Sequence, residues 1–496
     1  MKPHRAVAFV LASACARTVQ TQGSADASPP LVDAGPVHDA ATDASIDAPP
    51  DVPPVNTCSA FRLRSADLGT PAPAVYPGAL LLLHGDGLGS ATRVSVGGVD
   101  APLERPDATS LAVRVPPMLA VGPQSVTVAS DRCMASLTVS VSRLVAWAAS
   151  SGGPIFLHDL VTLDRVGSVN AGPVPMDRLV FTTDGEALVA HDVYGQLSAA
   201  RAWGGDDVIF GDTSTPFFVA GGTVVPTSVL VASGGALPLV RLDTDPVLSS
   251  HPIPGIAGAR AVACPLDGSR ALVLEASGAV TAVDLPFSVN VRTSPLVSAN
   301  ATTRAVELAM GQGAATTATG PLAALFEATS PPDIVAIDSA SGTILGRAAV
   351  PFAAGGLTFL SGDVVAVSAT TPELLTGDLG AAGVTVLRYP LAGELPDPTL
   401  RTVFAASGYR VGVVALRGGL GVRLHVFDFH REPAVEERSV ELPGIRGVAG
   451  VQGAGDPFVV WTATEILRVN GADGTIAARV VAGSSAMTIG ALAVAP

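Results

Sequence analysis

Short apolar stretches rich in valine and alanine alternate along this chain with glycine, aspartate and proline. Alternation of short apolar segments with turn residues is typical of strands, whereas an amphipathic helix repeats its apolar positions with a period of about 3.6 residues. Long segments with the helical period are missing from the sequence. The pattern therefore predicts an all-β protein.

From residue 143 to the C-terminus, the pattern contains a repeated unit. Its first element is a pair of apolar strands joined at a glycine-aspartate turn, with copies at Asp184-Gly185, Asp267-Gly268 and Gly362-Asp363. Asp-Gly between two strands is a strong hairpin signal, because glycine adopts the positive φ that a tight turn needs. We expect a hairpin at each of these places.

The second element of the unit is an apolar strand that ends in Asp or Asn shortly before a glycine. The clear copies are Asp338 with Gly342 and Asn470 with Gly474, and looser copies lie at Asp159, Asp243, Asp284 and Asp428. Positions 243 and 284 are 41 residues apart, positions 428 and 470 are 42 apart, and positions 159 and 243 are 84 apart. A period of this length suits the four-stranded blades of a propeller.

These repeats resemble the YVTN- or WD40-like β-propellers of secreted bacterial proteins, although the W-D and G-H markers are absent. The resemblance implies a propeller over residues 143–496, with a β-sandwich array or a β-solenoid as the structural alternative. Division of this length gives seven blades of about 50 residues or eight of about 44, and seven is preferred. The C-terminal GALAVAP is expected to supply a strand that closes the ring against the first blade after Arg143.

Residues 58–142 carry short strand patterns separated by glycine or proline turns every eight to twelve residues or so, which is the spacing of a β-sandwich. The informative segments are Pro77-Gly78, Gly85-Asp86-Gly87-Leu88, Val94–Gly98, Leu111–Pro116 and Gly122 before Val126–Val128. They resemble an IPT/TIG domain, the immunoglobulin-like fold of many cell-surface proteins. The resemblance implies an Ig-like β-sandwich that acts as a spacer or interaction module and contributes no catalytic residue.

The N-terminus has the order of a secretory leader. Lys2, His4 and Arg5 precede an apolar stretch that is shorter than the roughly 20 residues of a membrane span, so residues 1–14 are predicted to be a signal peptide. Leu11-Ala12-Ser13-Ala14-Cys15 resembles the lipobox of bacterial lipoproteins, with Ala12 where that family usually has Leu. The resemblance implies lipid attachment at Cys15. An ordinary Ala-x-Ala cleavage site is the alternative.

Residues 15–57 are predicted to be a disordered linker. Between Gly23 and Pro54 there are six Asp and seven Pro, with no Lys, Arg or aromatic residue. Such a segment cannot bury enough apolar area to offset the loss of chain entropy. It would reach roughly 40 Å as a coil and up to about 130 Å as polyproline II, which is enough to hold a domain away from a membrane surface.

The charge and the cysteines limit the environment and the partners. The formal net charge is −14 and no basic stripe is present, so no nucleic-acid partner is expected. The protein is expected to be a monomer.

In an oxidising compartment Cys58 and Cys133 could form a disulfide, and closure of that loop would stabilise the fold by about 4 kcal/mol; two separate thiols are the alternative. Cys264 is expected to be a buried, inert thiol.

Candidate chemistry is sparse. The pairs His158-Asp159 and His191-Asp192 resemble metal ligands, but adjacent residues of a strand point to opposite faces and cannot easily hold one ion. Asp206, Asp207 and Asp212 could bind calcium, although a solvated loop is the preferred interpretation. Trp147, Trp203 and Trp461 are expected to pack between blades. The motifs of serine hydrolases, P-loop proteins and zinc proteases are absent, so no catalytic residue, metal or cofactor is expected.

The leading hypothesis is a non-enzymatic, lipid-anchored protein of the bacterial cell envelope whose propeller binds a protein or glycan partner. A propeller enzyme, a lyase or hydrolase, is the alternative; it would gather Arg, His and acidic side chains at the central channel. A purely structural display protein is the third possibility. Acylation of Cys15 would place the chain at the membrane, and its absence would make it a soluble secreted or periplasmic protein.

Overall fold

The computed structural model describes part of the chain. The described residues are 57–69, 71–106, 109–116, 119–170, 173–181, 185, 187–194, 197–201, 217–218, 223–225, 228–230, 232–233, 237–241, 250–253, 256, 258–263, 270–284, 293–297, 305–314, 321–327, 332–339, 341–352, 354–360, 363–368, 373–378, 385–391, 401–431, 435–451 and 455–495. Within them the secondary structure is strand, apart from two short 3-10 helices, η1 (Thr57–Ala60) and η2 (Leu88–Ser90). The prediction of an all-β chain is therefore confirmed for these residues.

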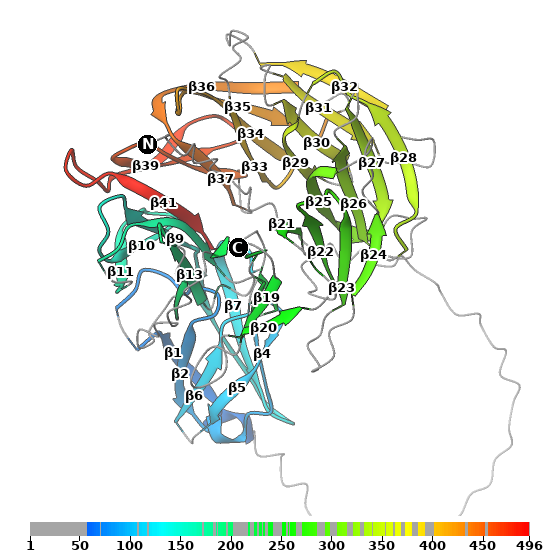
Figure 1. Ribbon diagram of the computed structural model, residues 1–496. Coiled ribbons are helices and arrows are strands. Elements are labelled where there is room, and N and C mark those ends of the chain that lie inside the picture. Colours follow the sequence, from blue (N-terminus) through cyan, green and yellow to red (C-terminus); the bar gives the residue numbers. More distant parts are fainter. Residues whose placement is uncertain are drawn as a thin grey trace, which may run out of the picture.

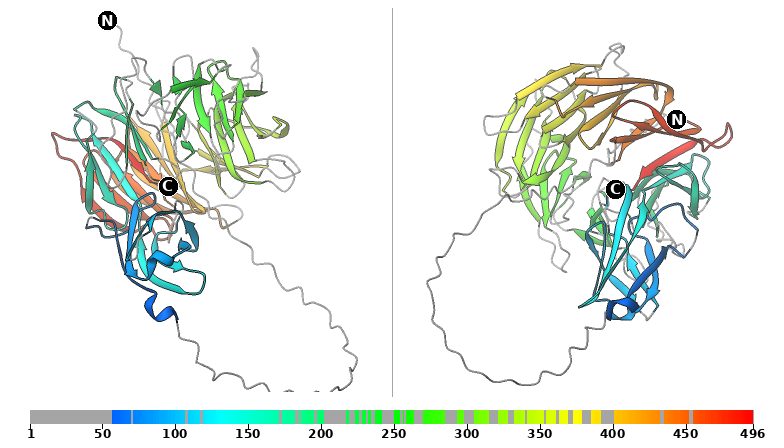
Figure 2. Two further views of the ribbon diagram at one scale, coloured as in Figure 1. Left: turned by 90° about the horizontal axis from the view of Figure 1, so that it is seen from below. Right: turned by 180° about the vertical axis from the view of Figure 1, so that it is seen from behind.

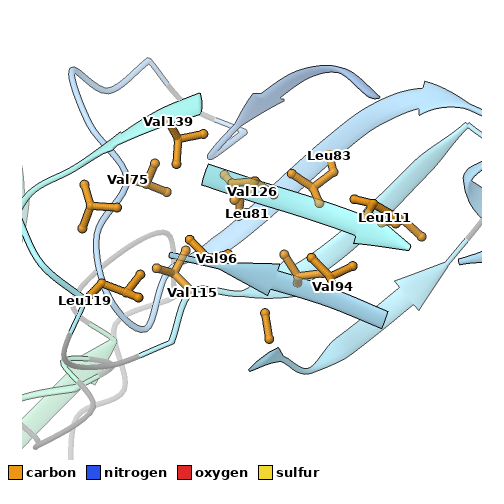
Figure 3. Packing of buried hydrophobic residues seen from close by; sticks show 14 of the residues in the cluster. Val75, Leu81, Leu83, Val94, Val96, Leu111, Val115, Leu119, Val126 and Val139 are labelled. Carbon is orange, nitrogen blue, oxygen red and sulfur yellow. The ribbon is translucent and has the colours of Figure 1, made fainter. Parts of the chain in front are cut away.

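The N-terminal part consists of two four-stranded antiparallel sheets. The first has the order β1 (Arg62–Asp67), β2 (Leu80–Asp86), β6 (Ser110–Arg114), β5 (Leu103–Pro106), and the second the order β4 (Val99–Ala101), β3 (Arg93–Val96), β7 (Gly122–Ala129), β8 (Met134–Val141). Alternate residues of both sheets point into one apolar cluster, with Leu81, Leu83 and Leu111 from the first sheet and Val94 and Val126 from the second (Figure 3). The two sheets therefore form a sandwich with its own core.

After residue 143 the described strands form eight sheets of three or four strands, and a two-stranded sheet of β15 (Phe217–Phe218) and β18 (Ala232–Ser233). The first sheets are β41 (Ile489–Val494), β9 (Leu144–Ala149), β10 (Ile155–Asp159), β11 (Arg165–Val169); β12 (Met176–Phe181), β13 (Ala187–Asp192), β14 (Leu197–Arg201); and β16 (Thr223–Val225), β17 (Ser228–Leu230), β19 (Leu237–Arg241), β20 (Ser250–Ile253).

The remaining five sheets each consist of four consecutive strands. They are β21 (Ala259–Ala263), β22 (Arg270–Glu275), β23 (Val280–Asp284), β24 (Thr293–Val297); β25 (Ala305–Ala314), β26 (Pro321–Glu327), β27 (Asp333–Asp338), β28 (Ile344–Ala349); β29 (Ala354–Leu360), β30 (Asp363–Ser368), β31 (Glu373–Asp378), β32 (Thr385–Pro390); β33 (Arg401–Ser407), β34 (Arg410–Arg417), β35 (Leu420–Asp428), β36 (Val435–Ile445); and β37 (Gly447–Gly450), β38 (Pro457–Trp461), β39 (Glu465–Asn470), β40 (Ile476–Val481).

The sheets are placed around a common centre. The first strands of successive sheets, β21, β25, β29, β33 and β37, contact one another and lie on the inside, while β24, β28, β32 and β36 lie on the outer rim (Figure 1). Two views from other directions show the same arrangement with the sandwich attached at one side (Figure 2). Four-stranded antiparallel sheets arranged in this way form a β-propeller.

The sheet count favours the smaller of the two expected blade lengths. The turns that begin at Asp338 and Asn470 lie 132 residues and three sheets apart, which gives 44 residues for each sheet. Eight sheets of three or four strands follow residue 143 in the described part of the chain. The preference for seven blades therefore gives way to the alternative of eight.

The C-terminal strand belongs to the same sheet as the first strand of the propeller. β41 pairs with β9 in antiparallel register, with Leu492 opposite Trp147, as expected for the GALAVAP segment. Ile489 packs in a cluster with Val459 and Ile466 of the preceding sheet. Ala491 packs on the other side, in a cluster with residues of β12 and β13. One strand thus joins the two ends of the propeller chain.

Deletion of residues 487–496 should destabilise the whole propeller cooperatively. The deletion removes an inner strand that packs against the sheets on both sides, so the loss should exceed the roughly 3 kcal/mol of emptying one large buried side chain. Val481→Ser, at a position that is 69% exposed, is the control and should change stability by no more than about 0.5 kcal/mol. Thermal unfolding measures both, and an unchanged melting temperature after the deletion would contradict this role of β41.

Candidate functional site at the junction of sandwich and propeller

The third strand of six propeller sheets ends in a polar residue, and a turn follows it at Asp159, Asp338 and Asn470 in the described chain. That strand ends in Asp or Asn in each of them, at Asp159, Asp284, Asp338, Asp378, Asp428 and Asn470. In the two clearest copies, the glycine four residues on has a φ of 72°, and its N–H donates to the carbonyl of Asp338 or Asn470 at 2.8 Å. The second repeat element is therefore confirmed at these turns, whereas Asp243 lies outside the described residues.

The side chains at the strand ends stabilise these turns. Asp338 Oδ1 accepts the N–H of Ser341 at 3.0 Å, Asn470 Oδ1 that of Ala472 at 3.0 Å, and Asp428 Oδ1 that of His430 at 2.9 Å. Short polar side chains favour turns because they bond to backbone groups a few residues ahead. The buried acids of the repeat thus have a local structural role.

In the first sheet, the place of the turn glycine is taken by Leu163, whose φ is 59°. Such a φ is strained for a residue with a branched side chain, so neighbouring groups must hold it. His158 does so, because its Nδ1 lies 2.8 Å from the Leu163 carbonyl oxygen, and its Nε2 accepts the indole N–H of Trp147 at 3.1 Å. These partners place the imidazole proton on Nδ1, and burial lowers the pKa of His158.

The same turn binds the sandwich. Asp159 Oδ1 accepts the N–H groups of Val161 and Thr162 at 2.8 and 2.9 Å, and its Oδ2 accepts the hydroxyl of Tyr76 at 3.1 Å. Tyr76 belongs to the sandwich and is fully buried. Burial, and then the charge of Asp159, raise the pKa of the Tyr76 hydroxyl. The carboxylate of Asp159 therefore connects the two parts of the molecule.

Apolar packing continues across this contact. Tyr76 and Ala79 lie in one cluster with residues of β9 to β13 of the propeller. The β12–β13 hairpin at Gly185 comes so close to the sandwich that a Cβ added there would lie 3.3 Å from the Pro77 carbonyl oxygen. Sandwich and propeller therefore share a core at the junction.

Arg143, the first residue of the predicted propeller region, lies inside this junction. It is 3% exposed, and its Nη2 donates to the carbonyl oxygen of Leu119 in the sandwich at 2.5 Å. Its own carbonyl accepts the N–H of Leu160 at 2.9 Å. Burial lowers the pKa of Arg143 to about 10.

A second group of charges lies between the β33–β36 and β37–β40 sheets. Arg410 donates from Nε to Glu437 at 3.0 Å and from Nη1 to Asp456 at 2.6 Å, and its side chain is 13% exposed. Gly408 has a φ of 56°, and a Cβ added there would collide with Asp456 Oδ1. Burial opposes the charge of Asp456 and raises the pKa of its carboxyl despite the neighbouring arginine.

Tyr409, His430 and Arg431 are exposed beside this group and are called here the Tyr409 patch. The rings of Tyr409 and His430 have centroids 4.4 Å apart, and Arg431 Nε lies 3.7 Å from Asp428. Burial alone would raise the pKa of Asp428, but the N–H and ring of His430 hold it below its ordinary value. The patch is exposed and combines an aromatic ring with a cation, which is a composition typical of protein interfaces.

The predicted separation of the two His-Asp pairs is confirmed. His158 bonds to Trp147 and Leu163, whereas Asp159 bonds to Tyr76. His191 Nδ1 pairs with Asp177, and Asp192 accepts the N–H of Tyr194 at 2.8 Å. Across the residues that the structure describes, no group of three or more His, Cys, Asp or Glu side chains is arranged to hold a metal ion.

Several predicted residues cannot be placed. Cys15, Trp203, Cys264 and the acidic loop of Asp206, Asp207 and Asp212 lie outside the described residues. Cys58 and Cys133 form a disulfide in the structure, with Cα atoms 5.3 Å apart. None of the helices in the described residues is sufficiently long and apolar for a membrane span.

The inner strands bear on the alternative of an enzyme. The buried side chains of β33, β37 and β41 pack between sheets and are small or apolar, such as Ala405, Val448 and Ala491. β12 differs, because it carries Asp177, the partner of His191, and the half-buried Arg178. On the inner strands whose side chains are described, β12 thus brings one acid and one arginine together.

The chain resembles known proteins in its fold and not in its sequence. No protein-family model matches the chain, and no curated protein matches it. Solved structures with a similar arrangement include BamB from Moraxella catarrhalis (14% identity, 69% of this chain and 90% of that chain, TM-score 0.41) and Sqt1 from Chaetomium thermophilum (13%, 68% and 89%, TM-score 0.46). AztD from Citrobacter koseri shows 8% identity over 72% of this chain and 99% of its own, with a TM-score of 0.39.

Sequence reasoning found the turn aspartates and missed their partners. Asp159 is one of the looser copies of the repeat, but no sequence pattern predicts that Tyr76, which lies 83 residues earlier, is its partner. In the sequence Arg143 marks only a domain boundary, and Arg410 follows Gly408-Tyr409 without any motif around it. Asp378 could have been found, because it ends the apolar segment ELLTGD in the same way as the other copies.

Tyr76→Phe should weaken the attachment of the sandwich. The variant removes the hydroxyl that bonds to a buried carboxylate, which should cost roughly 1.5–3 kcal/mol in the free energy of unfolding. Tyr194→Phe is the matched control, because that ring is 74% exposed, and it should cost less than about 0.5 kcal/mol. Urea unfolding measures both; equal midpoints for the two variants would exclude the proposed role of Tyr76.

The free energy of unfolding should fall as the pH is lowered below about 6.5, the ordinary pKa of histidine, because of His158. The folded protein holds His158 neutral with a lowered pKa, whereas the unfolded chain binds a proton below about pH 6.5. This contribution is therefore present above pH 6.5 or so and is lost below it. His158→Asn should be less stable than the parent at pH 8, and the difference should narrow towards pH 5.

Trp147→Phe serves as the control for that experiment. It removes the donor to Nε2 and keeps the titrating ring, so its stability should still depend on pH in this range. Circular dichroism in urea measures all three proteins. A difference between parent and His158→Asn that stays constant from pH 8 to pH 5 would show that His158 is not the linked group.

Proposed function

We propose that this protein is a non-enzymatic binding protein of the bacterial cell envelope, tethered by a lipid on Cys15, that presents its propeller to a protein partner. The observation that carries the proposal is the fusion of the sandwich to the propeller. η1, where the described chain begins, lies at the end of the sandwich that is far from the propeller (Figures 1 and 2). A tether at that end holds the propeller outward.

The disulfide supports this role. Cys58 lies in η1, and its partner Cys133 immediately precedes β8, which ends at Val141 beside the propeller. Eight residues of strand span roughly 26 Å. Tension on the linker would therefore pass through the disulfide into β8 and on to Arg143, without unfolding the other strands of the sandwich. Such a path suits a stalk, on which the propeller keeps a constant orientation.

The distribution of chemistry favours binding over catalysis. The buried acids Asp159, Asp338 and Asp428 stabilise turns, and His158 stabilises the backbone of Leu163. At the Tyr409 patch, aromatic, cationic and polar groups are exposed together. Tyrosine and arginine contribute strongly to many protein interfaces, so we assign the partner contact to this patch.

The test uses cells that produce the full chain with a photo-crosslinking residue in place of Tyr409. We expect an adduct with one defined protein in the envelope fraction, and a mature N-terminus at an acylated Cys15 by intact mass. Cys15→Ala should move the protein out of the membrane fraction while leaving the adduct-forming surface intact.

A crosslinker in place of Met134, which is 73% exposed on the sandwich, is the matched control and should give no adduct with the same protein. An unmodified mature N-terminus would refute the tether. Equal adducts from positions 134 and 409 would refute the assignment of the Tyr409 patch as the binding surface.

A further inference from the structure

Arg143 carries a buried charge with little to balance it. Of its three guanidinium nitrogens, Nη2 donates to the Leu119 carbonyl, while Nε and Nη1 have no hydrogen-bond partner among the residues that the structure describes. The residue is 3% exposed, so bulk water does not reach the guanidinium to any useful extent. At least two donors of a positive group are thus left unmatched inside the junction.

Deprotonation does not remove the problem. Burial lowers the pKa of Arg143 only to about 10, so the guanidinium remains charged at neutral pH. A buried charge without a counter-charge is unfavourable, and leaving one partner of a buried pair alone is strongly destabilising. Some group of negative charge is therefore needed beside Arg143.

Among the described residues, the neighbouring side chains do not supply that charge. Asp159 is the acid of the adjoining turn, but its oxygens bond to Tyr76 and to N–H groups of the turn, and the pKa of Arg143 is shifted by burial without any contribution from a charged neighbour. The segment that follows it lies between two arginines: the N–H of Leu160 donates to the Arg143 carbonyl, and the carbonyl of Val161 accepts from Arg468 at 3.3 Å.

Two further donors near this segment are also unmatched. Arg468 Nε is buried without a partner in the described chain, and so is Ser142 Oγ, next to Arg143 in sequence. The surroundings of the turn are thus rich in donors and in positive charge. Water could satisfy the hydrogen bonds, but it would not balance the charge.

We propose that the junction binds one small monovalent anion, of the size and charge of chloride, on the unmatched N–H donors of Arg143. Arg468 is only half-buried and is open to ions in the solvent, so the buried guanidinium of Arg143 alone calls for a bound charge, and one negative charge balances it. The near-complete burial of Arg143 selects for a small ion. Because Leu119 belongs to the sandwich and Arg143 begins the propeller, the ion would also fix the two parts relative to each other.

The test measures unfolding of the full-length protein at constant ionic strength while chloride replaces gluconate, which is too bulky for a buried site. A ligand that binds only the folded state divides the unfolding equilibrium constant by one plus the ratio of its concentration to its dissociation constant. Each tenfold increase in chloride above that constant should therefore change the unfolding equilibrium constant about tenfold. An unfolding midpoint that does not depend on chloride overturns the proposal.

Two variants test whether the chloride dependence of stability comes from Arg143. Arg143→Met removes the charge with little change in volume and should abolish the chloride dependence, while Arg64→Met, at a side chain that is 68% exposed, should retain it. If Arg143→Met does not fold, line broadening of the chloride NMR signal by the unaltered protein gives a direct measurement. Broadening that bromide competes away supports the site, and absence of broadening refutes it.

Discussion

The structure depends on a carboxylate that two parts of the chain share. Asp159 is buried, and a buried carboxylate is tolerated only when donors surround it. The backbone of its own turn supplies some of these donors, and Tyr76 supplies another from the sandwich. If the sandwich were removed, Oδ2 would lose a buried donor and the apolar residues around Tyr76 would lose their cover. The fusion of the two parts is therefore built into the first propeller sheet.

The same residue type has a simpler role in the other sheets. At Asp338 and Asn470 the side chain closes its turn, and a glycine accommodates the positive φ four residues later. At Asp159 the glycine has become Leu163, whose strained backbone is held by His158 and whose side chain fills the adjoining cluster. The turn after Asp159 therefore differs from the other copies in binding the sandwich through Tyr76. Packing of the Leu163 side chain offsets the cost of its strained φ.

The sequence predicts what depends on local chemistry. Asp-Gly turns and strand-ending aspartates indicate hairpins and turns because the relevant hydrogen bonds connect residues a few positions apart. The pairing of β41 with β9 could also be foreseen, because the chain ends in one more apolar strand. The contacts of Tyr76 with Asp159 and of Arg410 with Asp456 connect residues that are 83 and 46 positions apart, and no local pattern encodes them. The blade count was ambiguous for the same reason, since irregular loops blur a period of 44 residues.

The outer strands β28 and β40 of the propeller carry charges that oppose pairing with another chain. β28 and β40 expose Ile344, Ile476 and Val481 on the rim, and an exposed apolar edge strand invites pairing with another chain. Each strand also carries an arginine that reaches across to an acid on the neighbouring strand, Arg347 to Asp333 and Arg479 to Glu465. Both pairs are 14 residues apart and occupy the same place in their sheets, so the device is repeated. A charge at the middle of an edge strand would be desolvated by any strand that paired there, which disfavours edge-to-edge pairing at β28 and β40.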